Sequence, residues 1–384
     1  MSLLFETPSE SELRARGSAK WTAFPDAIGA FVAEMDFGMA PVIRDALIAE
    51  IDAARTGYLP AAQSAALAAA TAAWAADRYD WVVPEARIKP VADVLTGLDL
   101  VLHRYADAAK PVIVPTPAYM PFLQIPQRNG REIVEVPSPS SDGRYELDLD
   151  GIAAAFAAGA DTLVLCNPWN PAGRVLTRDE LVALSEVVDR FGGRVFADEI
   201  HAPVVLGERR HIPYASVNGT AASHTVTAIS ASKAFNLPGL KCAQLVFSND
   251  ADAERYEQVA GAVAHGASGF GVAANTAAYR DGGPWLDEVL VYLEDSAALV
   301  ARRLAERLPQ VGFRAPEGTY IGWLDVRALD LGDRPADVIR QRAGVALTDG
   351  AACGEAGRGF ARLVIATPQP VLEDVVDRLA RAFG

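Results

Sequence analysis

Cysteine is scarce in this chain of 384 residues, and lysine is almost as rare. The three cysteines, Cys166, Cys242 and Cys353, are scattered and show no CxxC spacing. An odd number without paired spacing argues against a disulfide framework and against a zinc site, so we expect no bound metal. The same usage is typical of proteins in a reducing compartment, and we predict a cytoplasmic location.

Long apolar runs and basic clusters are missing as well. The longest alanine-rich run, Ala65–Ala76, is interrupted by Thr71 and carries Trp74 at helical spacing, which predicts an ordinary helix and not a membrane span. The segment Met1–Pro8 lacks an apolar core of signal-peptide length. The net charge is −14 without any run of Lys or Arg, so neither nucleic acid nor a membrane is an expected partner.

What is present is a strand–helix alternation that begins near residue 90. A hydrophobic content of 51% over 384 residues predicts a globular chain of two domains. Continuous apolar strands separated by helical patterns predict an α/β fold with a mostly parallel sheet flanked by helices. The expected strands are Pro111–Pro115, Arg131–Val136, Thr162–Cys166, Arg194–Ala197, Thr225–Ser230 and Ala243–Phe247, and the expected helices are Leu149–Ala158 and Arg178–Phe191, the latter with a capping box of Thr177 and Glu180.

The alternation of strand and helix patterns ends at Gly282-Gly283-Pro284. A long helical pattern over Trp285–Leu308 leads into the strand-like segments Gly318–Asp325 and Phe360–Ala366. We therefore predict a large domain over residues 46–284 and a smaller α+β domain over residues 285–384. An N-terminal segment, residues 1–45, is expected to join the small domain.

Three polar residues stand in loops that follow expected strands, where the ligands of parallel sheets bind. Lys233 is one of few lysines and lies in a Ser-rich turn, Asp198 ends a strand, and Asn170 lies in an Asn/Pro-rich loop. Taken alone, Lys233 could be an exposed loop lysine, Asp198 a helix cap and Asn170 a turn residue. Three such loops at the same sheet edge are hard to produce by chance, so they predict one shared site.

Five motifs extend this pattern across nearly the whole chain. They are Phe31-Val-Ala-Glu-Met-Asp-Phe37, Cys166-Asn-Pro-Trp-Asn-Pro171, Asp198-Glu-Ile-His201, Ser230-Ala-Ser-Lys-Ala-Phe-Asn236 and Trp285-Leu-Asp287. With them the chain resembles the pyridoxal-5′-phosphate (PLP) enzymes of fold type I, the class I/II aminotransferase superfamily. Within it the chain is most similar to the bacterial cystathionine β-lyases and cysteine C–S lyases of the MalY/PatB type.

The resemblance implies a role for each residue near the cofactor ring. Lys233 would bind PLP as a Schiff base and move the Cα proton of the substrate. Asp198 would face the pyridine nitrogen and keep it protonated, so that the ring can accept electrons. Asn170 and His201 match contacts with the phenolic oxygen, although many relatives have tyrosine at the second position. Tyr119 matches the residue that stacks on the ring.

The resemblance also implies a set of phosphate ligands, which combine helix N–H groups, hydroxyls and a cation. Lys241 stands where many aminotransferases have arginine, and it lacks the forked geometry of a guanidinium. A helix is expected over Leu98–Tyr105, directly after the phosphate turn. The matching residues are Thr96, Gly97, Leu98, Ser230, Ser232 and Lys241.

Three further residues bear on substrate and assembly. Arg362, within an apolar strand-like segment, matches the arginine that binds the substrate carboxylate in a bidentate pair. Tyr58 matches a tyrosine that reaches the phosphate of the neighbouring subunit, which implies a homodimer with shared active sites. Trp169 departs from the branch, which commonly has histidine there, and we expect this difference to affect substrate choice more than activity.

Two activities and one binding function are compatible with these residues. The branch implies β-elimination on cystathionine or another cysteine S-conjugate, giving thiol, pyruvate and ammonia. An aminotransferase acting on an amino acid and a 2-oxo acid shares every step up to the loss of the Cα proton. His201, Lys241 and the Phe31–Phe37 segment favour the lyase. A PLP-binding regulatory protein without turnover is disfavoured because the full set of catalytic residues is retained.

Overall fold

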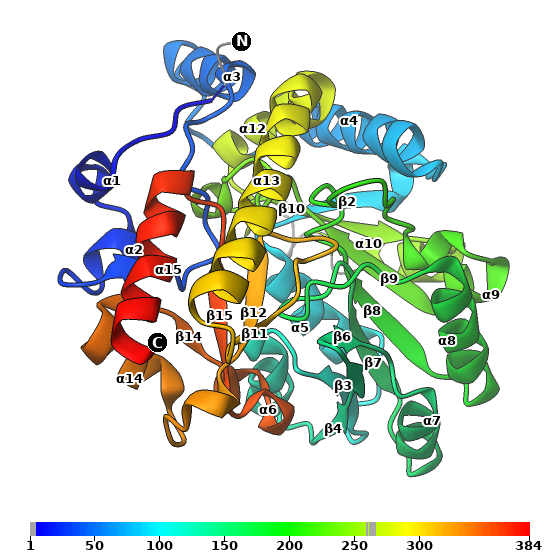
Figure 1. The fold of residues 1–384 in the computed structure, drawn as a ribbon. Helices are drawn as coiled ribbons and strands as arrows, with labels where there is room; N and C mark the ends of the chain where they lie inside the picture. Colours follow the sequence, from blue (N-terminus) through cyan, green and yellow to red (C-terminus); the bar gives the residue numbers. More distant parts are fainter. Residues whose placement is uncertain (1–4, 259, 261–265) are drawn as a thin grey trace.

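A seven-stranded sheet forms the centre of the computed structural model, which describes residues 5–258, 260 and 266–384 (Figure 1). Its strand order is β2-β10-β9-β8-β7-β3-β4, and every pair is parallel except the two pairs that β10 makes. The strands are β2 (Ile88–Val91), β3 (Val112–Thr116), β4 (Ile133–Pro137), β7 (Thr162–Cys166), β8 (Arg194–Asp198), β9 (Thr225–Ile229) and β10 (Ala243–Phe247). The predicted fold class and strands are confirmed, with β2 as an addition.

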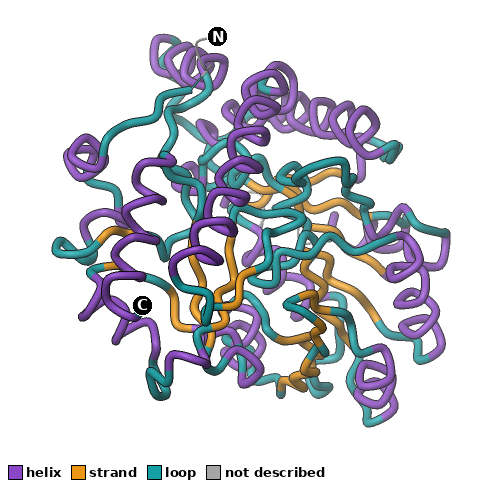
Figure 2. Tube along the Cα trace, in the orientation of Figure 1, coloured by secondary structure: helices purple, strands orange, loops and turns teal. Residues whose placement is uncertain are grey.

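Helices cover both faces of this sheet, as Figures 1 and 2 show. Successive side chains of a strand point to opposite faces, so a covered sheet needs apolar residues at every position. In β7, Leu163 and Leu165 share a core with α7 and α8, and Val164 shares the opposite core with α5 and α10. The covering helices are α5 (Val94–Arg104), α7 (Leu149–Ala157), α8 (Arg178–Arg190) and α10 (Asp250–Glu257).

Side-chain caps determine where two of these helices begin. In the predicted capping box of α8, the Thr177 hydroxyl accepts from the Glu180 N–H at 3.3 Å, and the Glu180 carboxylate accepts from the Thr177 N–H at 2.7 Å. Helix α5 begins at Val94, and the predicted start at Leu98 is wrong. The reason is Asp93, whose carboxylate accepts from the Thr96 N–H at 2.8 Å and caps the helix one turn earlier.

A second, antiparallel sheet has the strand order β11-β12-β15-β14 and shares a core with α13 and α15. Its strands are β11 (Gly312–Phe313), β12 (Ile321–Asp325), β14 (Thr348–Asp349) and β15 (Phe360–Val364), and the two helices are α13 (Gly283–Arg307) and α15 (Gln369–Phe383). Near the N-terminus, β1 (Ile28–Gly29) pairs in parallel with β13 (Val345–Ala346). This pairing supports our proposal that residues 1–45 and 285–384 form one domain beside the larger domain of residues 46–284.

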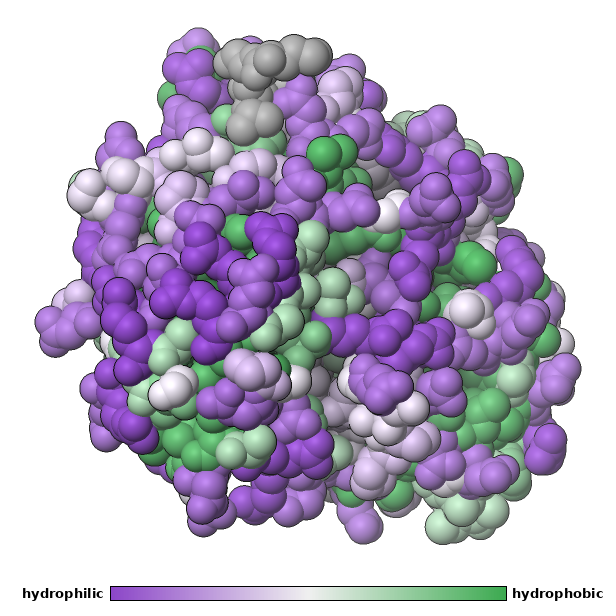
Figure 3. Space-filling model, in the orientation of Figure 1, coloured by the Kyte–Doolittle hydropathy of each residue, from purple (hydrophilic) through white to green (hydrophobic). Residues whose placement is uncertain are grey.

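The remaining α-helices and strands include the long helix α4 and the helix α12, whose buried face packs against α3 and α4. They are α1 (Glu10–Arg16), α2 (Ala19–Thr22), α3 (Pro41–Asp52), α4 (Ala61–Tyr79), α6 (Ile125–Arg128), α9 (Gly219–His224), α12 (Gly269–Asp281), α14 (Pro335–Ala343), β5 (Ser140–Ser141) and β6 (Arg144–Tyr145). Figure 3 shows mainly hydrophilic residues over the displayed face. Within the described parts of the chain, no helix has both the length and the apolar character needed to cross a bilayer.

Candidate active site

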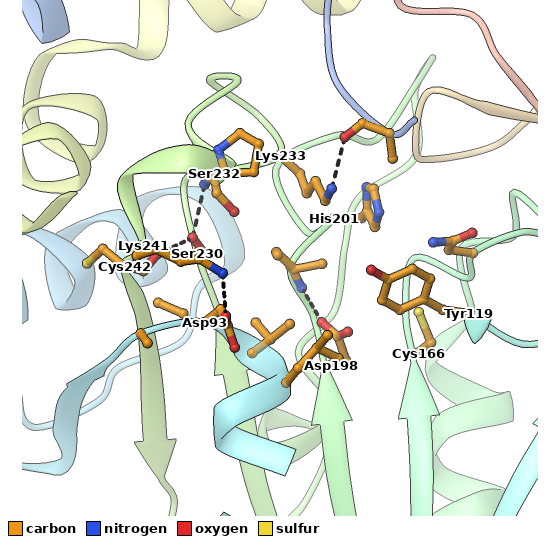
Figure 4. A pocket seen from close by; sticks show the side chains of 18 residues that line it. Asp93, Tyr119, Cys166, Asp198, His201, Ser230, Ser232, Lys233, Lys241 and Cys242 are labelled. Atoms are coloured by element: carbon orange, nitrogen blue, oxygen red, sulfur yellow. Dashed lines mark hydrogen bonds and ion pairs between the residues drawn. The ribbon is translucent and has the colours of Figure 1, made fainter. Parts of the chain in front are cut away.

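Loops that follow β3, β7, β8 and β9 meet at one cavity at the carboxyl edge of the central sheet (Figure 4). These strands are parallel, so their ends meet at the same edge. Most of the residues that the sequence singled out line this cavity, namely Tyr119, Asn170, Asp198, His201, Ser230, Ser232, Lys233 and Lys241. The structure therefore brings together side chains from four separate segments of the chain.

The amine of Lys233 is held inside the cavity. Its Nζ donates a hydrogen bond to the backbone carbonyl of Ala33 at 2.9 Å. Burial is the main cause that lowers the pKa of Lys233 to about 8, and the charge of Arg362 lowers it further. A lysine with such a pKa has a substantial neutral fraction near neutral pH, so it can act as a nucleophile or as a base.

Asp198 is the last residue of β8 and is only 2% exposed. Its Oδ1 accepts from the Ile200 N–H at 3.0 Å. Burial raises the pKa of Asp198 to about 7, and this hydrogen bond and the charge of Lys233 oppose the rise. Since an ionised carboxylate is costly to bury alone, the site favours a ligand that brings a cationic group to Asp198.

His201 and Tyr119 present ring groups to the same cavity (Figure 4). Burial lowers the pKa of His201 well below its usual value, so the ring is neutral. Its Nδ1 is buried and has no hydrogen-bond partner within the described structure, which leaves that atom for a ligand. Tyr119 packs edge-on against Phe122 with ring centroids 5.4 Å apart.

Arg362 stands behind Asn170 and does not itself line the cavity. Its guanidinium donates to three neutral oxygens: Asn170 Oδ1 at 3.2 Å, the Phe31 carbonyl at 2.9 Å and Thr348 Oγ1 at 3.3 Å. The residue is 3% exposed, and its Nε is buried without a partner in the described part of the chain. A buried cation surrounded by neutral oxygens favours an anionic ligand.

Two serines and a lysine lie at the other end of the cavity. Ser230 Oγ donates to the Cys242 carbonyl at 2.7 Å and accepts from the Ser232 N–H at 3.0 Å. Lys241 Nζ forms an ion pair with Asp93 Oδ2 at 2.9 Å. Hydroxyls, a cation and the first turn of α5 therefore gather at one place, which is the composition of an anion site.

The predicted phosphate turn needs a correction of one helical turn. Thr96, Gly97 and Leu98 do not line the cavity, whereas Asp93, Val94 and Leu95 do. Because α5 begins at Val94, Gly97 and Leu98 face the sheet: Leu98 is fully buried, and a Cβ on Gly97 would lie 2.7 Å from a Leu245 methyl carbon. Gly97 thus serves close packing of helix on sheet.

Tyr58 lies outside this cavity. It is 90% exposed in the loop between α3 and α4, beside a separate hollow that includes Arg55 and Phe270. In a single chain it therefore makes no contribution to the cavity that contains Lys233.

Several residues that shape the site have no role predicted from the sequence. Asn236 has a positive φ of 57°, and its side-chain amide accepts from the Met35 N–H at 2.9 Å and donates to the Met35 carbonyl at 2.8 Å. Asn236 and Met35 both belong to motifs on which the resemblance to the family rests, so their importance for the site could have been inferred from the sequence. Asp93 lies in none of these motifs, and its importance depends on where α5 begins.

Two tryptophans of the motifs support the loops of the site from behind. Trp285 stacks on Phe235 with ring centroids 5.7 Å apart, next to the turn that carries Lys233. Trp169 Nε1 donates to the Pro117 carbonyl at 2.8 Å, in the loop that leads to Tyr119. Trp169 does not line the cavity, so its position indicates support of this loop more than contact with a substrate.

Comparisons with known proteins agree with this geometry. The sequence model of the aminotransferase class I and II family matches residues 30–379. A cystathionine β-lyase of Corynebacterium glutamicum is 35% identical over 97% of this chain and 98% of its own length. A solved structure from Corynebacterium diphtheriae has a TM-score of 0.94 and 36% identity and covers 99% of both chains. The PLP-bound C–S lyase of Staphylococcus hominis has a TM-score of 0.88 and 25% identity, covering 96% of this chain and 94% of its own.

Proposed function

We infer the function of this chain from its family: it belongs to the class I and II aminotransferase family and, within it, to the branch of the cystathionine β-lyases. The chain is a PLP-dependent carbon–sulfur lyase that cleaves the bond between Cβ and sulfur of an amino acid. The observation that carries this conclusion is the convergence of Lys233, Asp198 and Asn170 in one cavity of a chain that matches a cystathionine β-lyase over nearly its full length. As substrate we propose cystathionine or another cysteine S-conjugate.

The residues of the cavity fit PLP. Lys233 offers an amine of lowered pKa to the aldehyde, and the buried Asp198 offers a carboxylate to the pyridine nitrogen. The unpartnered Nδ1 of His201 can donate to the phenolic oxygen. Asn170 can also donate to that oxygen through its amide NH₂, because its Oδ1 already accepts from Arg362. Tyr119 supplies an aromatic face.

The side chains can then carry out an elimination. Bound PLP supplies an electron sink for the electron pair that remains when the Cα–H bond breaks. We propose that Arg362 holds the substrate carboxylate, which orients the Cα proton toward Lys233. Lys233 removes this proton as a general base, and its ammonium form can protonate the departing sulfur. Asp198 keeps the pyridine nitrogen protonated throughout.

An assay with cystathionine tests the lyase against the aminotransferase alternative. We expect continuous release of thiol, pyruvate and ammonia without any added 2-oxo acid. An aminotransferase would stop after about one turnover per site until 2-oxoglutarate or pyruvate was supplied, because its cofactor would be left in the amine form. A stoichiometric change of the cofactor spectrum together with a requirement for the oxo acid would overturn the lyase conclusion.

We also propose a homodimer in which Tyr58 contacts the phosphate in the active site of the partner subunit. This proposal is supported by the 90% exposure of Tyr58 and by the exposed apolar residues Ile48 and Ile51 of the preceding helix α3. The homodimer is tested by sedimentation of the purified protein at several concentrations, which measures its mass in solution.

We propose the cytoplasm as the location, because the three cysteines are free.

A further inference from the structure

The phosphate end of the cavity contains a carboxylate as well as a cation. Asp93 and Lys241 both line the cavity, and their charged groups pair at 2.9 Å (Figure 4). Asp93 Oδ1 is occupied by the Thr96 N–H at 2.8 Å and the Thr96 hydroxyl at 2.9 Å. Oδ2 is the atom that accepts from Lys241. Burial raises the pKa of Asp93, but the hydrogen bonds from Thr96 and Lys241 outweigh it, so that the pKa is lowered and the ionised form is favoured.

This pairing leaves the phosphate end with little net charge. Among the described residues that line the cavity, Lys241 and Lys233 are the lysines, and no arginine lines it. Lys233 is committed to the aldehyde end, so Lys241 is the cation available to a phosphate. Its positive charge is offset by Asp93, in a place where a dianion has to bind. The helix N–H groups of Val94 and Leu95 and the Ser232 hydroxyl must then supply most of the binding, because the Ser230 hydroxyl already donates to the Cys242 carbonyl.

We propose that Asp93 weakens phosphate binding in this chain, both by direct repulsion and by holding Lys241 in an ion pair. Asp93 and Lys241 then act as one unit that sets how tightly the cofactor is retained. The proposal depends on the PLP function argued above. It assigns to Asp93 a role beyond that of a helix cap.

The substitution Asp93→Asn separates the charge from the cap. Asparagine is as good an N-cap as aspartate, so α5 keeps its start while the negative charge is lost. We expect the equilibrium dissociation constant for PLP, titrated into the apo-protein and followed by its visible absorbance, to fall by about three- to tenfold. Lys241→Gln should weaken PLP binding by a similar factor. The double variant should return close to the affinity of the unmodified protein.

Pyridoxal, which lacks the phosphate, provides the ligand control. Its affinity for Lys233 should be the same in the Asp93→Asn variant and in the unmodified protein, whereas a general change of the fold would affect pyridoxal and PLP alike. Asp99→Asn is the matched protein control, because Asp99 is an exposed residue of the same helix and does not line the cavity. The difference in PLP affinity should shrink at high ionic strength, since the side chains of Lys241 and Asp93 are 58% and 35% exposed.

The possible outcomes distinguish this inference from the function on which it depends. If the protein does not bind PLP at all, the proposed function fails. If PLP binds but Asp93→Asn leaves its affinity unchanged or weaker, Asp93 is only a helix cap and the inference is overturned. Tighter binding of pyridoxal together with PLP would also overturn it, because the effect would then not involve the phosphate.

Discussion

The Lys233 amine and the Ala33 backbone carbonyl, 200 positions apart in the chain, form a hydrogen bond of 2.9 Å. The Tyr320 hydroxyl donates to the same carbonyl at 3.0 Å. The Ala33 carbonyl oxygen therefore accepts hydrogen bonds both from Lys233, in the turn after β9, and from Tyr320, which directly precedes β12. When Lys233 is not bound to a cofactor, this contact keeps its amine at the cavity wall, close to where it must react.

The first prediction concerns the site of covalent attachment. Borohydride reduction of the PLP-loaded protein followed by peptide mapping should place the label on Lys233, and Lys233→Ala should lose both label and turnover. Lys20, Lys89 and Lys241 are each engaged with a carboxylate, so they compete poorly. Lys89→Ala is a suitable control and should keep the label. A label on any other lysine would remove Lys233 from its assigned role.

The rate of PLP capture by the apo-protein should depend on pH through Lys233. Only the neutral amine attacks an aldehyde, and burial lowers the pKa of Lys233 to about 8. The rate should therefore rise about tenfold per pH unit below that value and level off above it. Arg362→Gln should move the profile to higher pH, because the charge of Arg362 lowers this pKa. A midpoint near the ordinary lysine value of 10.5 would contradict the prediction.

Asp198→Asn should lose most activity while keeping the fold, since the charge that holds the pyridine proton is removed at nearly constant volume. Without PLP, the unmodified protein and the Asp198→Asn variant should differ in how their free energy of unfolding depends on pH. The pKa of Asp198 is raised from 3.8 to about 7, so the folded state binds this proton more tightly than the unfolded state. Stability should therefore fall as the pH rises from 4 to 7, by an amount on the order of a few kcal/mol, and the Asn variant should not show this fall. Thermal unfolding of both apo-proteins measures the difference.

Arg362→Lys should weaken binding of the substrate carboxylate. Loss of a charge-assisted bidentate pair costs roughly 1.5–3 kcal/mol, so kcat/KM should fall by roughly one to two orders of magnitude. Steady-state kinetics with an S-substituted cysteine provides the measurement. Arg378→Lys, on the outer face of α15, serves as a control and should be neutral. Kinetics unchanged in both variants would exclude Arg362 from substrate binding.

Asn236→Asp should loosen the contact between Asn236 and Met35. Aspartate still tolerates a positive φ, but it cannot donate to the Met35 carbonyl and places a negative oxygen beside it. We expect a loss of about 1–3 kcal/mol in unfolding free energy, measured by denaturant titration. Ser268→Asp is the control for the added negative charge, because Ser268 is a helix N-cap where aspartate serves equally well. Equal stability of both variants would show that the Met35 contact contributes little.

Much of the central sheet could be predicted from sequence because local and global signals coincide there. The strands Thr162–Cys166 and Ala243–Phe247 are continuous apolar segments between turn residues, and the structure has the same bounds. The positions of Lys233, Asp198 and Asn170 in one cavity follow from a general property of parallel sheets, so knowing which strand each follows was sufficient.

The rest depends on contacts between distant segments, which no local pattern contains. Strand β2 is short and includes Pro90, and it is formed only because β10 pairs with it. The misplaced start of α5 has a similar origin: both Asp93 and Thr96 are plausible caps, and only the three-dimensional structure shows that Asp93 accepts from Thr96. The pairing of Asn236 with Met35 spans 201 positions and could not be inferred from either motif alone.

The pairing of β1 with β13 has a consequence for the order in which the protein is made. Ile28 and Gly29 leave the ribosome early, but their partners Val345 and Ala346 are synthesised more than 300 residues later. Until then β1 has no strand to pair with, although β8, which ends at Asp198, and β9, which leads to the turn of Lys233, have already been synthesised. The first strand of the chain can therefore pair only after almost the whole chain has been synthesised, whereas every strand of the central sheet is available about a hundred residues earlier.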